Sequence, residues 1–63
     1  MNRIEAYRKN AKLTQQELAD LLEVDRSAVC RWETEGHIPR PATLRKLADL
    51  FGCRMGDLLE EEG

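Results

Sequence analysis

Apolar residues recur at helical spacing in several separate stretches of the chain. The longest motif begins at Thr14, where Leu18, Leu21 and Leu22 share one predicted helix face, since positions three and four apart lie together on a helix. Thr14 and Glu17 have the spacing of a capping box, in which each side chain bonds to the backbone N–H of the other residue. We therefore expect a helix directly after Thr14, with the three leucines as its buried stripe.

A second short helix is expected over residues 25–34, with Asp25 as its N-cap. Its side chains divide into two faces. The apolar face, which we assign to the core, comprises Ala28, Val29 and Trp32. The other face comprises Arg26, Ser27, Cys30 and Arg31. Because this second face carries two guanidinium groups and a hydroxyl without a carboxylate, it suits the major groove of DNA.

Three further helices complete the pattern. Asn2 is a candidate N-cap for a first helix ending near Asn10, whose inner face would be Ile4, Tyr7 and Ala11. Gly36 ends the helix over residues 25–34, and a loop with two prolines follows. These features predict an all-α protein with five helices in a compact bundle.

The two C-terminal helices have clear boundaries. Pro41 suits the first position of a helix, and Gly52 suits its end. The apolar positions between them are Leu44, Leu47, Ala48 and Phe51. A last helix is expected over about residues 55–60, with Leu58 and Leu59.

Length and composition exclude several classes of protein. Sixty-three residues predict one domain over residues 1–63. No apolar run approaches a membrane span and no signal-peptide pattern opens the chain, so we expect a cytoplasmic protein that does not contact membranes. One histidine and two cysteines, which form no C-x-x-C pair, match no familiar zinc spacing. We expect no metal, no cofactor and no enzymatic activity, because acid–base constellations and glycine-rich phosphate loops are also absent.

The net charge of −2 is unusual for a protein that binds nucleic acid. Four of the twelve acidic residues lie at the C-terminal end: Asp57, Glu60, Glu61 and Glu62. Without residues 57–63 there are ten basic against eight acidic residues, a net charge of +2. Charges more than ~8–10 Å from a docking face are screened, so the acidic end need not prevent DNA binding.

Residues 14–33 resemble the helix-turn-helix of the phage repressor/Cro-type family of bacterial DNA-binding regulators. The sequences Thr-Gln, Glu-Leu-Ala and Trp-Glu inside it are in register with Leu-Ala and Phe-Gly further along the chain. The resemblance extends from about residue 4 to residue 59. It implies a lambda-repressor-like DNA-binding domain with its helix-turn-helix at residues 14–34.

The resemblance also implies which residues touch DNA. The candidates for reading base edges are Arg26, Ser27 and Arg31, since an arginine fork fits the O6 and N7 acceptors of guanine. The candidates for backbone contact are Thr14, Gln15, Gln16, Cys30, His37 and Arg40. Three alternatives remain open. The arginines bind only phosphate or pair with Asp25 or Glu35. Ser27 touches a phosphate or nothing, and Cys30 contacts a thymine methyl, a sugar or nothing at all.

Two further features follow from the resemblance. Arg8 matches an arginine that pairs with the glutamate at the position of Glu33, which makes this pair a candidate link between the first and third helices. Lys12 and Glu23 stand where the family usually has glycine, at the turns between helices. A residue with a Cβ costs about 1 kcal/mol in a left-handed turn.

The expected function is therefore a transcriptional regulator, a repressor, that reads a pseudo-palindromic operator in double-stranded DNA as a homodimer through residues 25–34. The candidates for a dimer contact are Phe51, Met55, Leu58 and Leu59, each with core packing as the alternative role. No sensor domain is evident, so no small-molecule ligand is expected. The alternative function is an antitoxin or adaptor that acts mainly through protein contacts.

Overall fold

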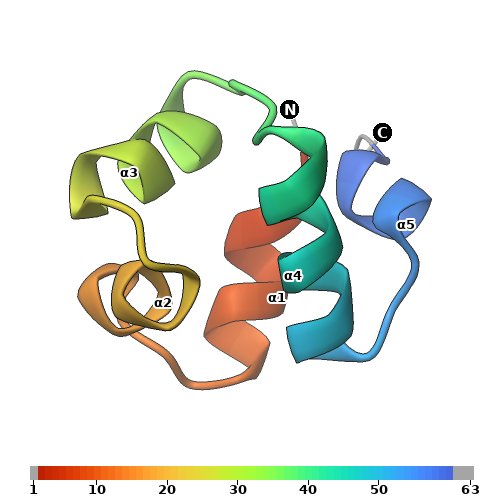
Figure 1. Cartoon of the computed structure of the whole chain (residues 1–63), viewed down its shortest axis with the longest axis horizontal. Coiled ribbons are helices and arrows are strands. Elements are labelled where there is room, and N and C mark those ends of the chain that lie inside the picture. The colour runs from red at the N-terminus through yellow and green to blue at the C-terminus, as the bar shows by residue number, and fades with distance from the viewer. Residues whose placement is uncertain (1, 61–63) are drawn as a thin grey trace.

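The computed structural model describes residues 2–60, and these residues form five α-helices without a strand. The helices are α1 (Ile4–Asn10), α2 (Gln15–Leu22), α3 (Arg26–Thr34), α4 (Pro41–Phe51) and α5 (Met55–Leu59) (Figure 1). The prediction of an all-helical, five-helix bundle is confirmed. None of these five helices has the length and apolar character needed to cross a bilayer.

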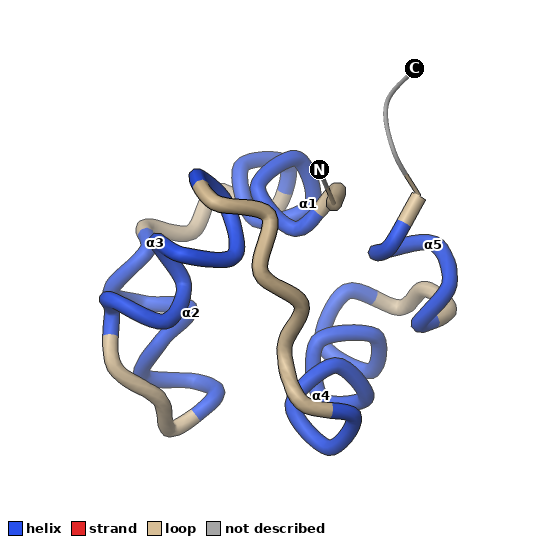
Figure 2. The backbone as a smooth tube through the Cα atoms, turned by 90° about the horizontal axis from the view of Figure 1, so that it is seen from above, coloured by secondary structure: helices blue, strands red, loops and turns tan. Residues whose placement is uncertain are grey.

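The helices enclose one apolar core. Helices α2 and α3 pack against each other at one side of the molecule, and α1, α4 and α5 complete the bundle (Figures 1 and 2). The two ends of the described chain are joined, because the Arg3 N–H donates to the Leu58 carbonyl at 2.8 Å and the Arg3 guanidinium lies 3.6 Å from Glu60. Residues 14–34 are held on the bundle by α1, which packs against α3, and by α4, which packs against α2.

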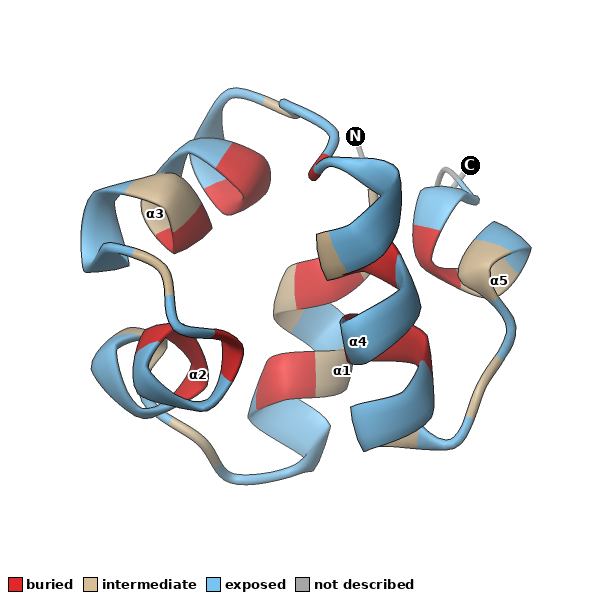
Figure 3. Ribbon diagram, viewed as in Figure 1, coloured by how far each residue is buried: buried red, intermediate tan, exposed pale blue. Residues whose placement is uncertain are grey.

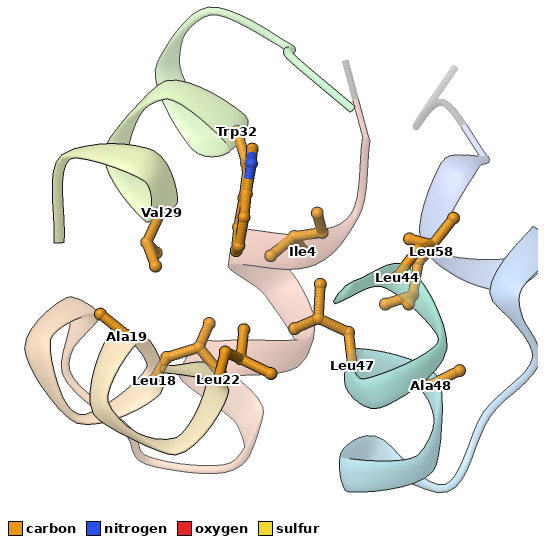
Figure 4. Close-up of a cluster of buried hydrophobic side chains, with 10 residues drawn as sticks. All are labelled: Ile4, Leu18, Ala19, Leu22, Val29, Trp32, Leu44, Leu47, Ala48 and Leu58. Atoms are coloured by element: carbon orange, nitrogen blue, oxygen red, sulfur yellow. The ribbon is translucent and has the colours of Figure 1, made fainter. Parts of the chain in front are cut away.

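The core contains apolar side chains from every helix, most of them at the predicted positions. Figure 4 shows these side chains converging from all five elements: Ile4, Leu18, Ala19, Leu22, Val29, Trp32, Leu44, Leu47, Ala48 and Leu58. Two assignments were wrong. Leu21 is 55% exposed and Ala11 is exposed, because the neighbouring helices cover only part of the stripe of α2 and because Ala11 lies in the turn after α1.

The helix ends follow the local sequence at most positions. Thr14 and Glu17 form the predicted capping box, with hydrogen bonds of 2.9 and 3.0 Å. Gly36 and Gly52 both have left-handed backbone, with φ of 70° and 66°, so each ends a helix as glycine favours. Asp25 is the N-cap residue of α3, but its side chain makes no capping hydrogen bond, so that part of the prediction was wrong.

Two non-glycine residues also adopt left-handed backbone. Lys12 has a φ of 61° between α1 and α2, and Glu23 has a φ of 58° between α2 and α3. The turns therefore keep the backbone conformation that suits glycine, although the side chains at both positions have a Cβ. Such a conformation costs an L-residue roughly 1–2 kcal/mol.

Lys12→Gly and Glu23→Gly are each expected to raise the free energy of unfolding by about 0.5–1 kcal/mol. Glycine removes the left-handed strain, and its greater freedom in the unfolded chain takes back part of the gain. Glu23 also loses a pair with Lys46 at 3.7 Å, which contributes little because both side chains are exposed. Urea unfolding measures the change, with Lys46→Ala as the control for the lost pair. A lower midpoint for both glycine variants would contradict this expectation.

The predicted dimer contacts are largely part of the fold. Leu58 is fully buried and is therefore unavailable to a partner. Phe51 is half-buried and stacks on Tyr7, with ring centroids 5.7 Å apart, and Met55 is half-buried against the core. Of the four candidates only Leu59, at 37%, counts among the exposed large apolar residues.

Cys53 is half-buried and packs against the core. Burial raises the pKa of its thiol above the ordinary value of 9.0. Burial likewise raises the pKa of the neighbouring Tyr7 hydroxyl. Cys53 is therefore a neutral thiol at pH 7, which disfavours chemical reactivity.

Candidate nucleic-acid interface

Helix α3 presents two chemically different faces. Val29 is fully buried, and Trp32 is 7% exposed. On the other side of the same helix, Arg26, Ser27 and Arg31 are exposed. Figure 3 shows the exposed parts of α3 in pale blue and the buried parts in red. The division of α3 that the sequence predicted is therefore present in the folded molecule.

The two arginines of α3 are free to meet a ligand. Within residues 2–60, neither Arg26 nor Arg31 forms an ion pair, so neither is bound to Asp25 or Glu35. Glu35 instead lies 3.7 Å from His37. Two exposed guanidinium groups on one short helix create a local positive potential, which attracts anionic ligands whatever the net charge of the chain.

A buried ion pair fixes α3 against α1. The Arg8 Nε–H donates to Glu33 Oε2 at 2.6 Å, and Nη2–H donates to Oε1 at 3.0 Å. Arg8 Nη1–H also donates to the Leu13 carbonyl at 2.7 Å. The hydrogen bonds to Glu33 raise the pKa of Arg8, so this arginine stays charged. The predicted pair between the first and third helices is confirmed, and Glu33 serves the fold.

The N-terminus of α2 is joined to the same pair. Gln15 is half-buried, and its Nε2 donates to Glu33 Oε1 at 3.0 Å. Gln16 is exposed and donates to Asp20 Oδ1 at 2.9 Å. Each amide keeps a second N–H, and the first backbone N–H groups of α2 have no partner within the helix. This end of α2 can therefore bind an anion while Gln15 stays on Glu33.

The remaining candidates lie in the middle of α3 and in the loop that follows it. Cys30 is half-buried, with its Sγ 3.9 Å from the Thr34 hydroxyl. His37 and Arg40 are exposed. Arg31, Trp32, His37 and Arg40 line a groove of about 330 Å³ between α3 and the start of α4. The structure thus brings Arg31 and Arg40 to one groove, although eight residues lie between them in the chain.

One residue that the sequence marked only as a helix cap has a wider role. Asn2 Oδ1 accepts the Ile4 N–H at 3.1 Å, one residue earlier than the N-cap position, which Arg3 occupies. Its Nδ2 also donates to the carbonyls of Trp32 and His37, at 3.0 and 3.3 Å. Asn2 is 30 positions from Trp32 and 35 positions from His37 in the chain, so no local sequence signal marks these contacts.

The part of the chain that the structure describes contains no cluster of three or more His, Cys, Asp or Glu side chains able to hold a metal ion. Cys30 and Cys53 are both free thiols.

Comparisons with known proteins agree with this geometry. A protein-family model described as "Helix-turn-helix" matches residues 4–58. The match covers nearly the same part of the chain as the resemblance over residues 4–59, and it includes the capping box of α2, the whole of α3 and the Arg8–Glu33 pair. No curated protein matches the chain.

Proposed function

The protein belongs to the Cro/C1-type helix-turn-helix family of DNA-binding regulators, and from this premise we propose that it is a transcriptional repressor. It binds a pseudo-palindromic operator in double-stranded DNA and inserts α3 into the major groove. Arg26, Ser27 and Arg31 read base edges there, because side chains near the N-terminus and on the outer face of such a helix reach the bases.

The single observation that carries the proposal is the division of α3. Arg26 and Arg31 are exposed and unpaired within residues 2–60, while Val29, Trp32 and Glu33 fix the opposite side of the helix. A guanidinium group that is held by no carboxylate can present both of its forked donors to guanine. Because the helix is already fixed from behind, DNA binding loses no further conformational entropy in ordering it.

Backbone contacts set the orientation of α3 on the duplex. We assign them to two groups, since contacts to phosphate determine register while contacts to bases determine specificity. The first group lies at the N-terminus of α2, where Thr14, Gln15 and Gln16 surround free backbone N–H groups. The second group is Cys30, in the middle of α3, with His37 and Arg40, which line the groove beside this helix.

The protein acts as a homodimer on DNA. One domain of this size contacts too few base pairs for specificity in a genome, whereas two copies read half-sites about 10 base pairs apart. Sedimentation at micromolar protein should give two copies for each selected duplex. A single copy on every duplex, with and without excess protein, would reject the dimer and leave the DNA-binding proposal standing.

Selection of bound sites from a random duplex pool tests the function directly. We expect a two-fold symmetric consensus whose half-sites contain a guanine for at least one arginine. Binding to the selected duplex should weaken steeply between 50 and 200 mM salt, with a log–log slope of about −0.9 for each phosphate contact. If no duplex binds at low salt while a protein partner does, the antitoxin or adaptor function replaces this one.

A further inference from the structure

The N-terminal segment of the chain is attached to the C-terminal end of the recognition helix. Arg31, Trp32, Glu33 and Thr34 form the last turn of α3, and the carbonyls of a last turn have no partner within the helix. The Arg31 carbonyl accepts the N–H groups of Glu35 and His37, at 3.0 and 3.4 Å. The next carbonyl, that of Trp32, accepts the Asn2 amide instead.

The Asn2 amide uses all of its hydrogen-bonding directions but one. Its two N–H groups reach the carbonyls of Trp32 and His37, and its oxygen accepts the N–H of Ile4. One side chain therefore joins the start of α1, the end of α3 and the loop after α3. Figures 1 and 2 show this loop passing close to the start of α1 on its way to α4.

The loop over residues 35–39 has few other attachments. Within residues 2–60, Asn2 is the one residue beyond α3 and this loop whose side chain bonds to the loop backbone, at the His37 carbonyl. Pro39 is buried, while Ile38 is 64% exposed. The N–H of His37 is held only at 3.4 Å, near the long limit for such a bond. The buried Pro39 and the Asn2 amide, whose bond to the His37 carbonyl is 3.3 Å long, are therefore the two attachments that hold this loop beside α3.

The loop sets the distance between two of the proposed DNA contacts. Arg31 lies on α3 and Arg40 lies at the end of the loop, and both line the groove beside α3. A shift of the His37 carbonyl moves Arg40 relative to Arg31, because only two residues separate His37 from Arg40. We infer that Asn2 is a positioning residue for DNA recognition, which holds the groove-lining arginines in register without touching DNA. This inference rests on the proposed function.

Asn2→Asp separates positioning from helix capping. Aspartate is as good a cap acceptor as asparagine and suits a helix N-terminus, so the bond from Ile4 is kept. It has no donor for the carbonyls of Trp32 and His37, and its charge repels both. Asn10→Asp is the matched control, because Asn10 is the other asparagine of the chain and is exposed at the far end of the same helix.

The experiment measures dissociation constants for the selected duplex and for duplexes with single base-pair changes, over a range of salt. For Asn2→Asp we expect about tenfold weaker binding of the selected duplex and a smaller penalty for changes at the Arg31 position, since each base contact is worth several-fold to a hundredfold in discrimination. The salt slope should fall by about 0.9 if the Arg40 phosphate contact is lost. Asn10→Asp should change affinity by less than about twofold, in line with a screened charge.

A purely structural role predicts a different result. In that case Asn2→Asp lowers the midpoint of thermal unfolding and the fraction of active protein. The base preference and the salt slope of the folded variant stay unchanged. If Asn2→Asp matches Asn10→Asp in base preference and salt slope while the wild type binds DNA, Asn2 is only a cap and the inference is wrong. If the wild type binds no duplex, the proposed function fails, and this inference fails with it.

Discussion

Replacement of Glu33 by alanine is expected to unfold a large part of the protein at room temperature. The Glu33 side chain is fully buried and accepts hydrogen bonds from Arg8 and Gln15. Its removal leaves the buried Arg8 guanidinium with Glu5, 4.0 Å away and half-exposed, as its nearest carboxylate, and breaking a buried pair in this way costs about 3–5 kcal/mol. A domain of this size has a total stability of roughly 3–9 kcal/mol, so the loss takes a large share of it.

The unfolding of this variant can be followed by the fluorescence of Trp32, the single and buried tryptophan, in a urea titration. The double variant Arg8→Met with Glu33→Leu is the control. It removes both charges and fills the space with apolar atoms, which is often neutral or stabilising. A Glu33→Ala protein within about 1 kcal/mol of the wild type would mean that water or a local shift compensates Arg8.

Arg31→Ala is expected to weaken binding to the selected operator by several-fold to a hundredfold and to relax the base preference at one position of each half-site. The estimate follows from ~1–3 kcal/mol for a bidentate contact with guanine. The stability of the protein should stay unchanged, because Arg31 is exposed and forms no ion pair within residues 2–60. Repeated site selection with the variant shows which base pair loses its preference.

Two further variants give this test its controls. Lys46→Ala removes the same charge from another surface, between α2 and α4, and should leave the base preference as it is. Gln15→Ala should weaken binding evenly across sequences, as loss of a phosphate contact does, with a modest loss of stability through its bond to Glu33. An Arg31→Ala protein with an unchanged consensus would mean that Arg31 binds only phosphate.

Several local features of the fold were predictable because they depend on residues a few positions apart. Thr14 and Glu17 form their capping box, Gly52 ends α4, and Arg26 and Arg31 share the exposed side of α3. Helix geometry alone places such residues together. The Arg8–Glu33 pair was expected only through the family resemblance, since nothing local relates residues 25 positions apart.

Other features required the packing of the helices. Leu21 has the spacing of a core residue but lies outside the area that α3 and α4 cover. Asp25 stands at the N-cap of α3, yet its side chain makes no cap. Lys12 and Glu23 accept left-handed backbone because the connections between packed helices require it. In each case the tertiary arrangement overrides a local preference worth about 1 kcal/mol.

The sequence by itself determined that the chain forms five helices and that α3 has one face for the core and one for solvent, because these properties follow from the helical period. The tertiary structure alone decided that Asn2 binds the end of α3, that Gln15 lies on Glu33, and that Arg31 and Arg40 face one groove. Such contacts depend on the angles and distances at which helices cross. Those are fixed by the fit of the whole core, which no short stretch of sequence contains.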